Sequence, residues 1–266
     1  MNESPNSIPG GHHMKKVVVV GASTGLGRCI AAGLAQRGDR VALLARTKDK
    51  VEAAAAEAGN GAIAIICDAT DEVSVRSAID QAAAAMDGID TVIYAAAVGP
   101  LSRLRDTDAA TWRWAFDTNV LGAALVTSAA IPHVTRSAGS VLYMSTTGSS
   151  YTPPWPGLGV YQVTKAALDR MVDSFRAEQQ GINFTRVTIG ECPGGEGDNQ
   201  TQFNAGWDMS LVGEFAGEWI GRGYMNMAFI DIVHLVDVFY TLVHAGASVQ
   251  VPSITIIPRP ALPDGA

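Results

Sequence analysis

The sequence predicts an α/β fold in which one doubly wound parallel sheet carries helices on both of its faces. Short apolar runs alternate with helix-like segments through the first hundred residues, which is typical of consecutive βαβ units. The first run, Lys15–Val20, ends in four valines, as expected for a strand buried on both sides. Of the 266 residues, 47% are hydrophobic and 17% charged, so the chain can bury a sizeable core as a single domain.

The elements follow from this alternation in chain order. Short apolar runs bounded by turn residues predict strands at Lys15–Val20, Arg40–Ala45, Ala62–Cys67, Thr91–Ala97, Ser140–Met144, Asn183–Ile189 and Ser253–Ile257. Alanine-rich or amphipathic stretches between them predict helices at Arg28–Arg37, Asp49–Ala58, Glu72–Met86, Trp112–Thr135, Val160–Gln180 and Phe229–His244. Gly38 is expected to end the first helix, and Pro132 to interrupt the fourth.

Two segments fall outside this alternation. Residues 1–14 are polar and rich in Pro and Gly, so we expect a flexible leader or tag remnant. His12 and His13 have no partner ligands nearby, and no metal site is expected. The Gly-rich and aromatic stretch Pro193–Gly223 breaks the alternation, and we expect a substrate loop at 193–227 within a domain spanning 15–260.

Charge and cysteine content exclude several classes of protein. The net charge of −7 offers no general attraction to nucleic acid or to anionic membranes. The sequence shows no apolar run of 18 residues and no signal-peptide core, so no membrane span is expected. The three cysteines are far apart and include no Cys-x-x-Cys pair, which indicates neither zinc nor disulfides and favours a cytoplasmic setting.

The segment Gly21-Ala-Ser-Thr-Gly25-Leu-Gly27 lies directly between a predicted strand and a predicted helix. In that context Gly21 allows a tight turn, Gly25 lets a pyrophosphate approach the backbone, and Gly27 lets the helix pack close to the sheet. The free amides of the helix N-terminus favour phosphate. The sequence therefore predicts a dinucleotide site here. The alternative is a glycine-rich turn that only serves the fold.

The second strand indicates which dinucleotide is bound. Sites for NAD place an acidic residue about 20 residues after the glycine motif, but the strand Arg40–Ala45 ends without an acid and is followed by Arg46 and Thr47. A guanidinium can hold a 2′-phosphate in a bidentate manner, whereas a carboxylate would repel it. This pattern favours NADP(H) over NAD(H). The alternative is that Arg46 is a solvated residue at a strand end.

Tyr161 and Lys165 are four residues apart at the start of a predicted helix, so they share one face of that helix. A free phenol has a pKa of about 10, and a nearby ammonium group lowers that pKa by favouring the phenolate. Such a tyrosine can exchange a proton with a carbonyl oxygen. The pair is a common match by itself and gains meaning from its companions.

These companions occur in a fixed order along the chain. They are Asp68 after the third strand, Asn119 in Asp-Thr-Asn-Val-Leu-Gly, Ser145 after a strand, and Pro193-Gly194 after the next strand. Together with the glycine segment and the Tyr-Lys pair, they make the chain resemble the short-chain dehydrogenase/reductase family over roughly Lys16 to Ile257. The resemblance implies a Rossmann fold, an NAD(P)-dependent oxidoreductase acting on a carbonyl/alcohol pair, and a homodimer or homotetramer.

The resemblance also implies a role for individual residues. Tyr161 would be the general acid/base, Lys165 would hold the nicotinamide ribose, Ser145 would bond the reacting oxygen, and Asn119 would anchor a water. The residues expected to bind the dinucleotide are Gly21, Ser23, Thr24, Gly25, Leu26, Gly27, Arg46, Thr47, Asp68, Ala69, Ala95, Ala96, Ala97, Asn119, Tyr161, Lys165, Pro193 and Gly194. Taken singly, Asn119 can also be read as a polar residue that kinks a helix, and Asp68 as a helix N-cap.

Several departures from the family pattern leave alternatives open. Counting along the strand from Gly139 favours Thr146 as the active-site hydroxyl, whereas the Ser-x-x-Gly pattern from Ser145 to Gly148 favours Ser145. The family's usual Asn-Asn-Ala-Gly is replaced by Tyr94-Ala95-Ala96-Ala97, which keeps a non-catalytic nucleotide sensor or scaffold as an alternative function. The expected substrate loop contains Phe203, Trp207, Met209, Leu211, Phe215, Trp219, Tyr224, Met225 and Met227. These side chains suit an apolar substrate or, alternatively, pack within a lid or an oligomer contact.

Overall fold

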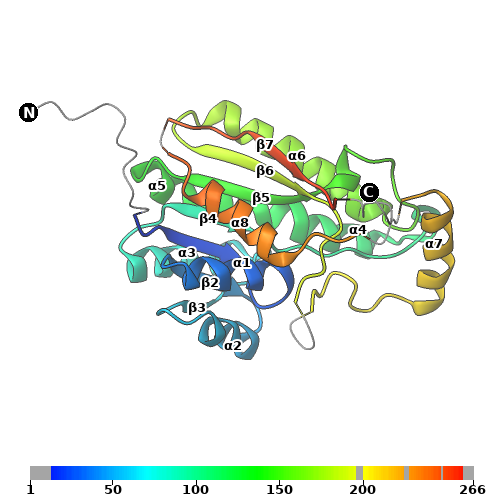
Figure 1. The fold of residues 1–266 in the computed structure, drawn as a ribbon, viewed down its shortest axis with the longest axis horizontal. Helices are drawn as coiled ribbons and strands as arrows, with labels where there is room; N and C mark the ends of the chain where they lie inside the picture. Colours follow the sequence, from blue (N-terminus) through cyan, green and yellow to red (C-terminus); the bar gives the residue numbers. More distant parts are fainter. Residues whose placement is uncertain (1–12, 196–199, 225–227, 247, 260–266) are drawn as a thin grey trace, which may run out of the picture.

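The computed structural model describes residues 13–195, 200–224, 228–246 and 248–259. Its strands are β1 (Lys16–Val20), β2 (Arg40–Ala45), β3 (Ile63–Ile66), β4 (Thr91–Tyr94), β5 (Ser140–Thr146), β6 (Asn183–Ile189) and β7 (Ser253–Ile256). They form one parallel sheet in the order β3-β2-β1-β4-β5-β6-β7 (Figure 1). The predicted doubly wound parallel sheet is therefore confirmed. Of the expected leader, only His13 and Met14 belong to the described residues.

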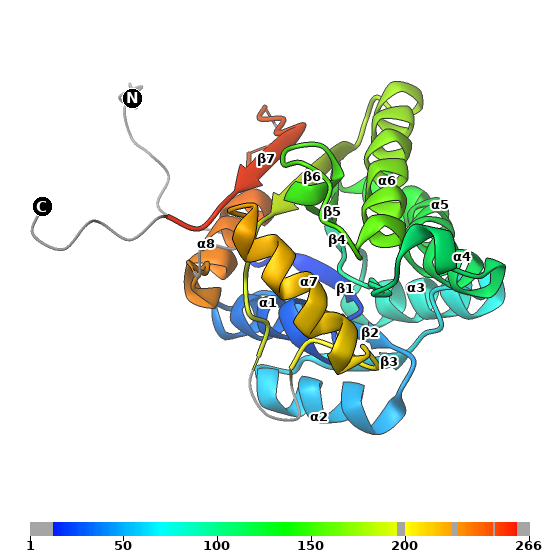
Figure 2. The ribbon, with the colours of Figure 1, turned by 90° about the vertical axis from the view of Figure 1, so that its right-hand side faces the viewer.

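The helices are α1 (Gly25–Gln36), α2 (Lys48–Ala58), α3 (Glu72–Met86), α4 (Ala109–Phe116), α5 (Gly122–Arg136), α6 (Gly159–Glu178), α7 (Met209–Gly221) and α8 (Ile232–Val243). They cover both faces of the sheet, with α1 and α8 on one side and α3, α5 and α6 on the other (Figure 2). Two apolar cores result. One packs α1, α2 and α8 against residues such as Val17 and Val19, and the other packs α3, α5 and α6 against Val18 and Val20.

The long helix predicted at Trp112–Thr135 is interrupted, but not at Pro132. Pro132 lies inside α5, whereas a π-helical turn, η2 (Asp117–Leu121), separates α4 from α5. The Tyr94 hydroxyl donates to the Thr118 carbonyl at 2.5 Å, the acceptor that the Gly122 amide would use in a regular α-helix. Gly122 donates to Asp117 instead. The interruption therefore arises from a contact with the sheet that helical periodicity does not show.

The segment Pro193–Gly223 also differs from its prediction as a loop, because it contains helix α7. The Asp208 side chain caps this helix at the Ser210 amide, and Phe215 and Trp219 are buried on its inner face. In Figure 1, α7 lies beyond the carboxyl ends of the strands. This position makes α7 and the segment before it one wall of the region next to those strand ends.

The helical stretch Ala109–Arg136 is apolar and long enough to cross a membrane, judged by length and composition alone. In the structure, 44% of its most apolar window is buried, and α5 packs against α3 and the sheet. The apolar composition of this stretch is therefore explained by its packing in one of the two cores.

Candidate active site

A cavity of about 630 Å³ lies at the carboxyl ends of the strands, within the roughly 300–1,000 Å³ typical of ligand pockets. It extends from Gly21–Gly27 and Arg46 at one end to Tyr161 and Lys165 at the other. Ligands of open α/β sheets bind at this edge. The predicted residues that line it are Gly21, Ser23, Thr24, Gly25, Leu26, Gly27, Arg46, Thr47, Asp68, Ala69, Ala95, Ala96, Ala97, Ser145, Tyr161 and Lys165.

Asn119, Pro193 and Gly194 do not line this cavity. Gly194 packs behind the glycine segment instead, where a Cβ on it would lie 2.8 Å from the Leu26 nitrogen. Its carbonyl accepts a hydrogen bond from the Thr201 amide at 2.9 Å. Gly194 thus joins the glycine segment to the chain that follows β6.

The glycine segment has the geometry of a phosphate cradle. Helix α1 begins at Gly25, three residues before the predicted start, so its free amides belong to the segment itself. Gly25 has a φ of +59°, and a Cβ on Gly21 would lie 2.5 Å from the Ala96 nitrogen. The Thr24 side chain makes no capping hydrogen bond to the helix. The backbone amides are therefore open to an anion, and the segment fits a pyrophosphate.

Beside the glycine segment, the same end of the cavity carries two cations and an acid. Arg46, Thr47 and Lys50 line it after β2, so Lys50 is a cation that the sequence reasoning missed. The Asp68 carboxylate accepts hydrogen bonds from the Thr70 amide at 2.9 Å and the Thr70 hydroxyl at 2.8 Å. Asp68 does not cap α3, because Asp71 does so through the Ser74 amide. Burial acts to raise the pKa of Asp68, but Thr70 and Arg46 hold that pKa below its ordinary value.

Tyr161 and Lys165 lie one turn apart at the start of α6, as predicted. The Lys165 ammonium is buried, donates to the Met144 carbonyl at 2.7 Å and lies 5.8 Å from the centre of the Tyr161 ring. Burial lowers the pKa of Lys165 to about 8, against the opposing effect of Asp169. The expected lowering of the Tyr161 pKa is not seen in this state, because burial raises it more than a hydrogen bond with Thr146 lowers it.

The two hydroxyls at the end of β5 have different partners. The Thr146 hydroxyl lies close enough to the Tyr161 phenol to act to lower the pKa of that phenol. The Ser145 hydroxyl is buried and lies 3.4 Å from the Ser149 hydroxyl. Ser149 in turn donates to the Asp169 carboxylate at 2.7 Å. The structure therefore places Thr146 beside the tyrosine, and Ser145 beside a buried acid.

Asn119 lies in η2 and is completely buried. Its side-chain oxygen accepts from the Val98 amide at 2.8 Å, and its nitrogen donates to the Val98 carbonyl at 2.9 Å and the Thr164 hydroxyl at 2.8 Å. Thr164 donates to the Tyr161 carbonyl at 2.7 Å. The Asn119 amide therefore fixes the chain after β4 relative to the turn that carries Tyr161.

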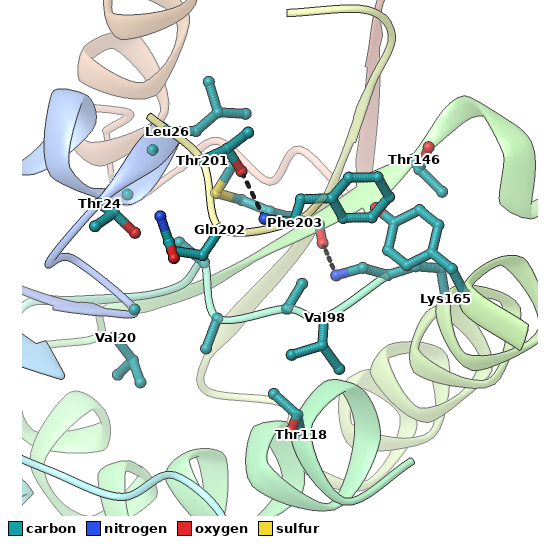
Figure 3. Close-up of a pocket in the computed structure, with 18 of the residues that line it drawn as sticks. Val20, Thr24, Leu26, Val98, Thr118, Thr146, Lys165, Thr201, Gln202 and Phe203 are labelled. Carbon is teal, nitrogen blue, oxygen red and sulfur yellow. Dashed lines mark hydrogen bonds between the residues drawn. The ribbon is translucent and has the colours of Figure 1, made fainter. Parts of the chain in front are cut away.

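The sequence reasoning missed a short segment on the open side of the cavity. Thr201, Gln202 and Phe203 lie between the glycine segment and Lys165 (Figure 3). A Cβ on Gly25 would lie 3.1 Å from the Thr201 Cα, so this segment touches the cradle directly. Only Phe203 had been singled out, because loop residues of this kind carry no periodic pattern that relates them to the cradle.

Most of the aromatic residues expected to contact a substrate pack against each other instead. Phe215 and Trp219 are buried with Leu101 in a third apolar cluster. Trp155 joins that cluster and also lines the cavity. Met209 is 75% exposed. Phe203 is the described member of the predicted set that lines the cavity; Met225 and Met227 lie outside the described residues.

Comparison with known proteins places this site in a family. A family model described as short chain dehydrogenase matches residues 15–203. The chain belongs to the short-chain dehydrogenase family. The solved structures that it resembles include an alcohol dehydrogenase from the archaeon Thermococcus sibiricus complexed with 5-hydroxy-NADP. That structure has a TM-score of 0.77 and 22% identity, and the match covers 95% of this chain and 100% of the other.

Curated relatives of this short-chain dehydrogenase differ in how much of their length is matched. A sulfoacetaldehyde reductase from Chromohalobacter salexigens is 27% identical over 91% of this chain and 93% of the relative. A glycine betaine reductase from Emericella nidulans is 30% identical over 69% of this chain. The matched region spans only 15% of that second relative.

Proposed function

We propose that this short-chain dehydrogenase interconverts a carbonyl compound and an alcohol with NADP(H), and that Tyr161 is the general acid/base. The observation that carries the proposal is one cavity with a phosphate cradle at one end and, at the other, Tyr161 next to the buried Lys165. The nicotinamide, when bound, supplies or accepts the hydride. A dinucleotide that spans the cavity leaves the Tyr161 hydroxyl to serve the oxygen of the substrate.

In carbonyl reduction, the Tyr161 hydroxyl gives its proton to the carbonyl oxygen, and in alcohol oxidation the phenolate takes it back. Thr146, which acts to lower the pKa of the phenol, would donate a hydrogen bond to the same oxygen. The positive charge of Lys165 favours the phenolate once a ligand excludes water from the cavity. Asn119 holds the α6 turn that carries Tyr161 through its contact with Thr164.

The preference for NADP(H) rests on Arg46 and Lys50, which line the cavity after β2 with no acid at the strand end. Two exposed cations there suit a 2′-phosphate. The solved alcohol dehydrogenase named above contains an NADP analogue, and the curated relatives are named as reductases. These names support the proposal and argue against a purely non-catalytic sensor.

We also propose a homodimer or homotetramer built on α4, α5 and α6. Leu121 in η2 and Val163 in α6 are 46% and 45% exposed, which suits burial against a second copy. The molecular mass in solution, measured by light scattering, is the direct test of this assembly.

The test of the proposed reaction compares wild type with Tyr161→Phe. We expect the variant to lose about 10²–10⁴-fold in reduction of a panel of aldehydes and ketones, because the proton donor is gone. Its NADPH affinity, followed by nicotinamide fluorescence, should change far less. Full reductase activity in the variant would show that the proton comes from another group.

A further inference from the structure

The Phe203 side chain lies against the proposed acid/base. Its ring makes an edge-to-face contact with Tyr161, with centroids 4.7 Å apart, and a second edge-to-face contact with Trp207 at 5.5 Å. Figure 3 shows it reaching from Thr201 and Gln202 toward Thr146 and Lys165. Phe203 therefore occupies the space next to the Tyr161 ring that a reacting molecule needs.

Tyr161 and Trp207 form two walls of this space, and Gly99 forms the third. A Cβ on Gly99 would overlap the Phe203 ring, so the chain after β4 lies directly against the aromatic face. The Trp207 indole nitrogen donates to the Gly99 carbonyl at 2.6 Å, which fixes two of the walls relative to each other. Tyr161, Trp207 and Gly99 thus contact the Phe203 ring from three directions. We call the space that this ring occupies the aryl box.

The backbone on both sides of Phe203 is anchored, because the Thr201 amide donates to the Gly194 carbonyl at 2.9 Å and the Trp207 amide donates to the Asn204 carbonyl at 3.2 Å. The Phe203 amide donates to the Thr201 hydroxyl at 3.2 Å, and Gln202, Asn204 and Ala205 are exposed. The walls belong to α6 and to the hydrogen-bonded pair of Trp207 and Gly99. Rotation of the partly exposed Phe203 side chain away from Tyr161 would therefore empty the box and leave its walls in place.

On the basis of the proposed function, we infer that the aryl box is the subsite for an aromatic ring attached to the substrate carbonyl, and that Phe203 is a gate that fills it when no substrate is bound. The preferred substrates are then aryl aldehydes and aryl ketones, which put the ring where Phe203 lies and the carbonyl oxygen next to the Tyr161 hydroxyl. The three walls carry no formal charge, so a neutral ring is favoured over a charged one.

The kinetic test measures kcat/KM with NADPH for benzaldehyde and for propanal. We expect wild type to prefer benzaldehyde by at least about fivefold, because its ring can make the two edge-to-face contacts that Phe203 makes with Tyr161 and Trp207. Gly99→Ala should reduce this preference at least fivefold, because its Cβ enters the box. Phe203→Ala should lower KM for benzaldehyde and keep the preference. Gly217→Ala is the matched control and should keep the wild-type values. A Cβ added at this glycine in α7 would meet nothing within 4 Å apart from the backbone of its own helix.

A binding experiment separates this inference from the proposed function. Benzamide carries the ring but is not reduced, and its dissociation constant can be measured calorimetrically even if no carbonyl compound is turned over. We expect Phe203→Ala to bind benzamide at least threefold more tightly than wild type, and the double variant with Gly99→Ala to lose that gain. Equal kcat/KM values of the wild-type enzyme for benzaldehyde and propanal would overturn the inference. Benzamide binding that neither Phe203→Ala nor the added Gly99→Ala changes would overturn it as well. So would a Phe203→Ala variant in which only NADPH affinity changes, since the ring would then cover the nicotinamide site.

Discussion

At the end of β5, two adjacent hydroxyl side chains point to different partners because successive residues of a strand face opposite sides. Thr146 lies close to the Tyr161 phenol, and Ser145 faces Ser149 near the buried Asp169. In the sequence, counting along the strand from Gly139 favours Thr146 as the active-site hydroxyl, and the Ser-x-x-Gly pattern that ends at Gly148 favours Ser145. The contact with Tyr161 is the observation that favours Thr146.

We expect Thr146→Val to lower kcat/KM for carbonyl reduction by about 10–100-fold, the value of one or two charge-assisted hydrogen bonds at the reacting oxygen. Removing the effect of Thr146 also raises the pKa of Tyr161 further, so the ascending limb of the pH profile of alcohol oxidation should move to higher pH. Thr146→Ser should restore most of the activity. Steady-state kinetics across pH measure both effects, and a larger loss in Ser145→Ala would assign the role to Ser145.

Lys165 provides a prediction about stability. Its pKa falls from 10.5 to about 8 on folding, which corresponds to roughly 3 kcal/mol of destabilisation while both states are charged. That cost is complete below pH 8, shrinks as pH rises toward 10.5, and vanishes above it. Lys165→Met should therefore raise the free energy of unfolding by about 1–3 kcal/mol at pH 7, after loss of the bond to Met144, while abolishing activity.

Urea unfolding of both proteins at pH 7 and near pH 10, at one protein concentration, checks this prediction. The gain in stability of Lys165→Met should be smaller at the higher pH. A variant that is less stable than wild type at pH 7 would mean that the charged lysine stabilises the fold.

The sequence predicted the members of the site better than their contacts. Tyr161, Lys165 and the glycine segment could be predicted because their spacing along one element decides their geometry. The partners of Asn119 could not, because folding alone brings Val98 and Thr164 near it. The bond from Ser149, the neighbour of Ser145, to Asp169 could not be predicted for the same reason. Phe203 was predicted only as a member of an aromatic loop, since no local pattern relates it to Tyr161.

At the scale of elements, the junction of β1, the glycine segment and α1 depends on Gly27. A Cβ there would overlap the Gly21 carbonyl, which lies in backbone that cannot move alone. Gly27→Ala should destabilise the protein by about 1–3 kcal/mol and weaken NADPH binding. Gly217→Ala in α7 meets no neighbour within 4 Å and should stabilise by up to about 1 kcal/mol. The thermal unfolding midpoints of the two variants, measured with and without NADPH, test this prediction. Equal midpoints for Gly27→Ala and Gly217→Ala would show that a Cβ at Gly27 is not crowded.

Helices and strands were predicted well where the hydrophobic periodicity agrees with the turn and capping residues at the ends of the element. Strands β2 and β6 have the predicted bounds, and α3 begins after its capping acid. The interruption at η2 was missed because it depends on the hydroxyl of Tyr94, the last residue of β4, which is more than 20 residues away in the sequence. Helix α7 was missed because Gly213, Gly217 and Gly221 lower helix propensity, which tertiary packing of Phe215 and Trp219 outweighs.

At the scale of the whole molecule, an acidic protein binds an anionic cofactor. The net charge is −7, yet Arg46 and Lys50 are exposed cations beside the cavity. Exposed ion pairs are screened by salt, so the ratio of NADPH to NADH affinity should fall as sodium chloride is raised. Arg46→Ala should lower this ratio about tenfold and flatten its salt dependence.

Fluorescence titrations at several salt concentrations measure this ratio. Lys48→Ala is the matched control, because Lys48 is exposed two residues away but pairs with Glu52 and lies outside the cavity lining. If Lys48→Ala lowered the ratio of NADPH to NADH affinity as much as Arg46→Ala, the preference would come from the general positive potential of this surface and not from a contact between Arg46 and the 2′-phosphate.

The aromatic packing around α7 has a consequence for spectroscopy. All five tryptophans lie between residues 112 and 219, and three of them, Trp155, Trp207 and Trp219, belong to or flank the cluster beside the cavity. The first hundred residues contain none. Tryptophan emission of this protein therefore reports the side of the molecule that carries the aromatic cluster around α7. Loosening of β1, α1 or β2, which contain no tryptophan, must be followed by another probe.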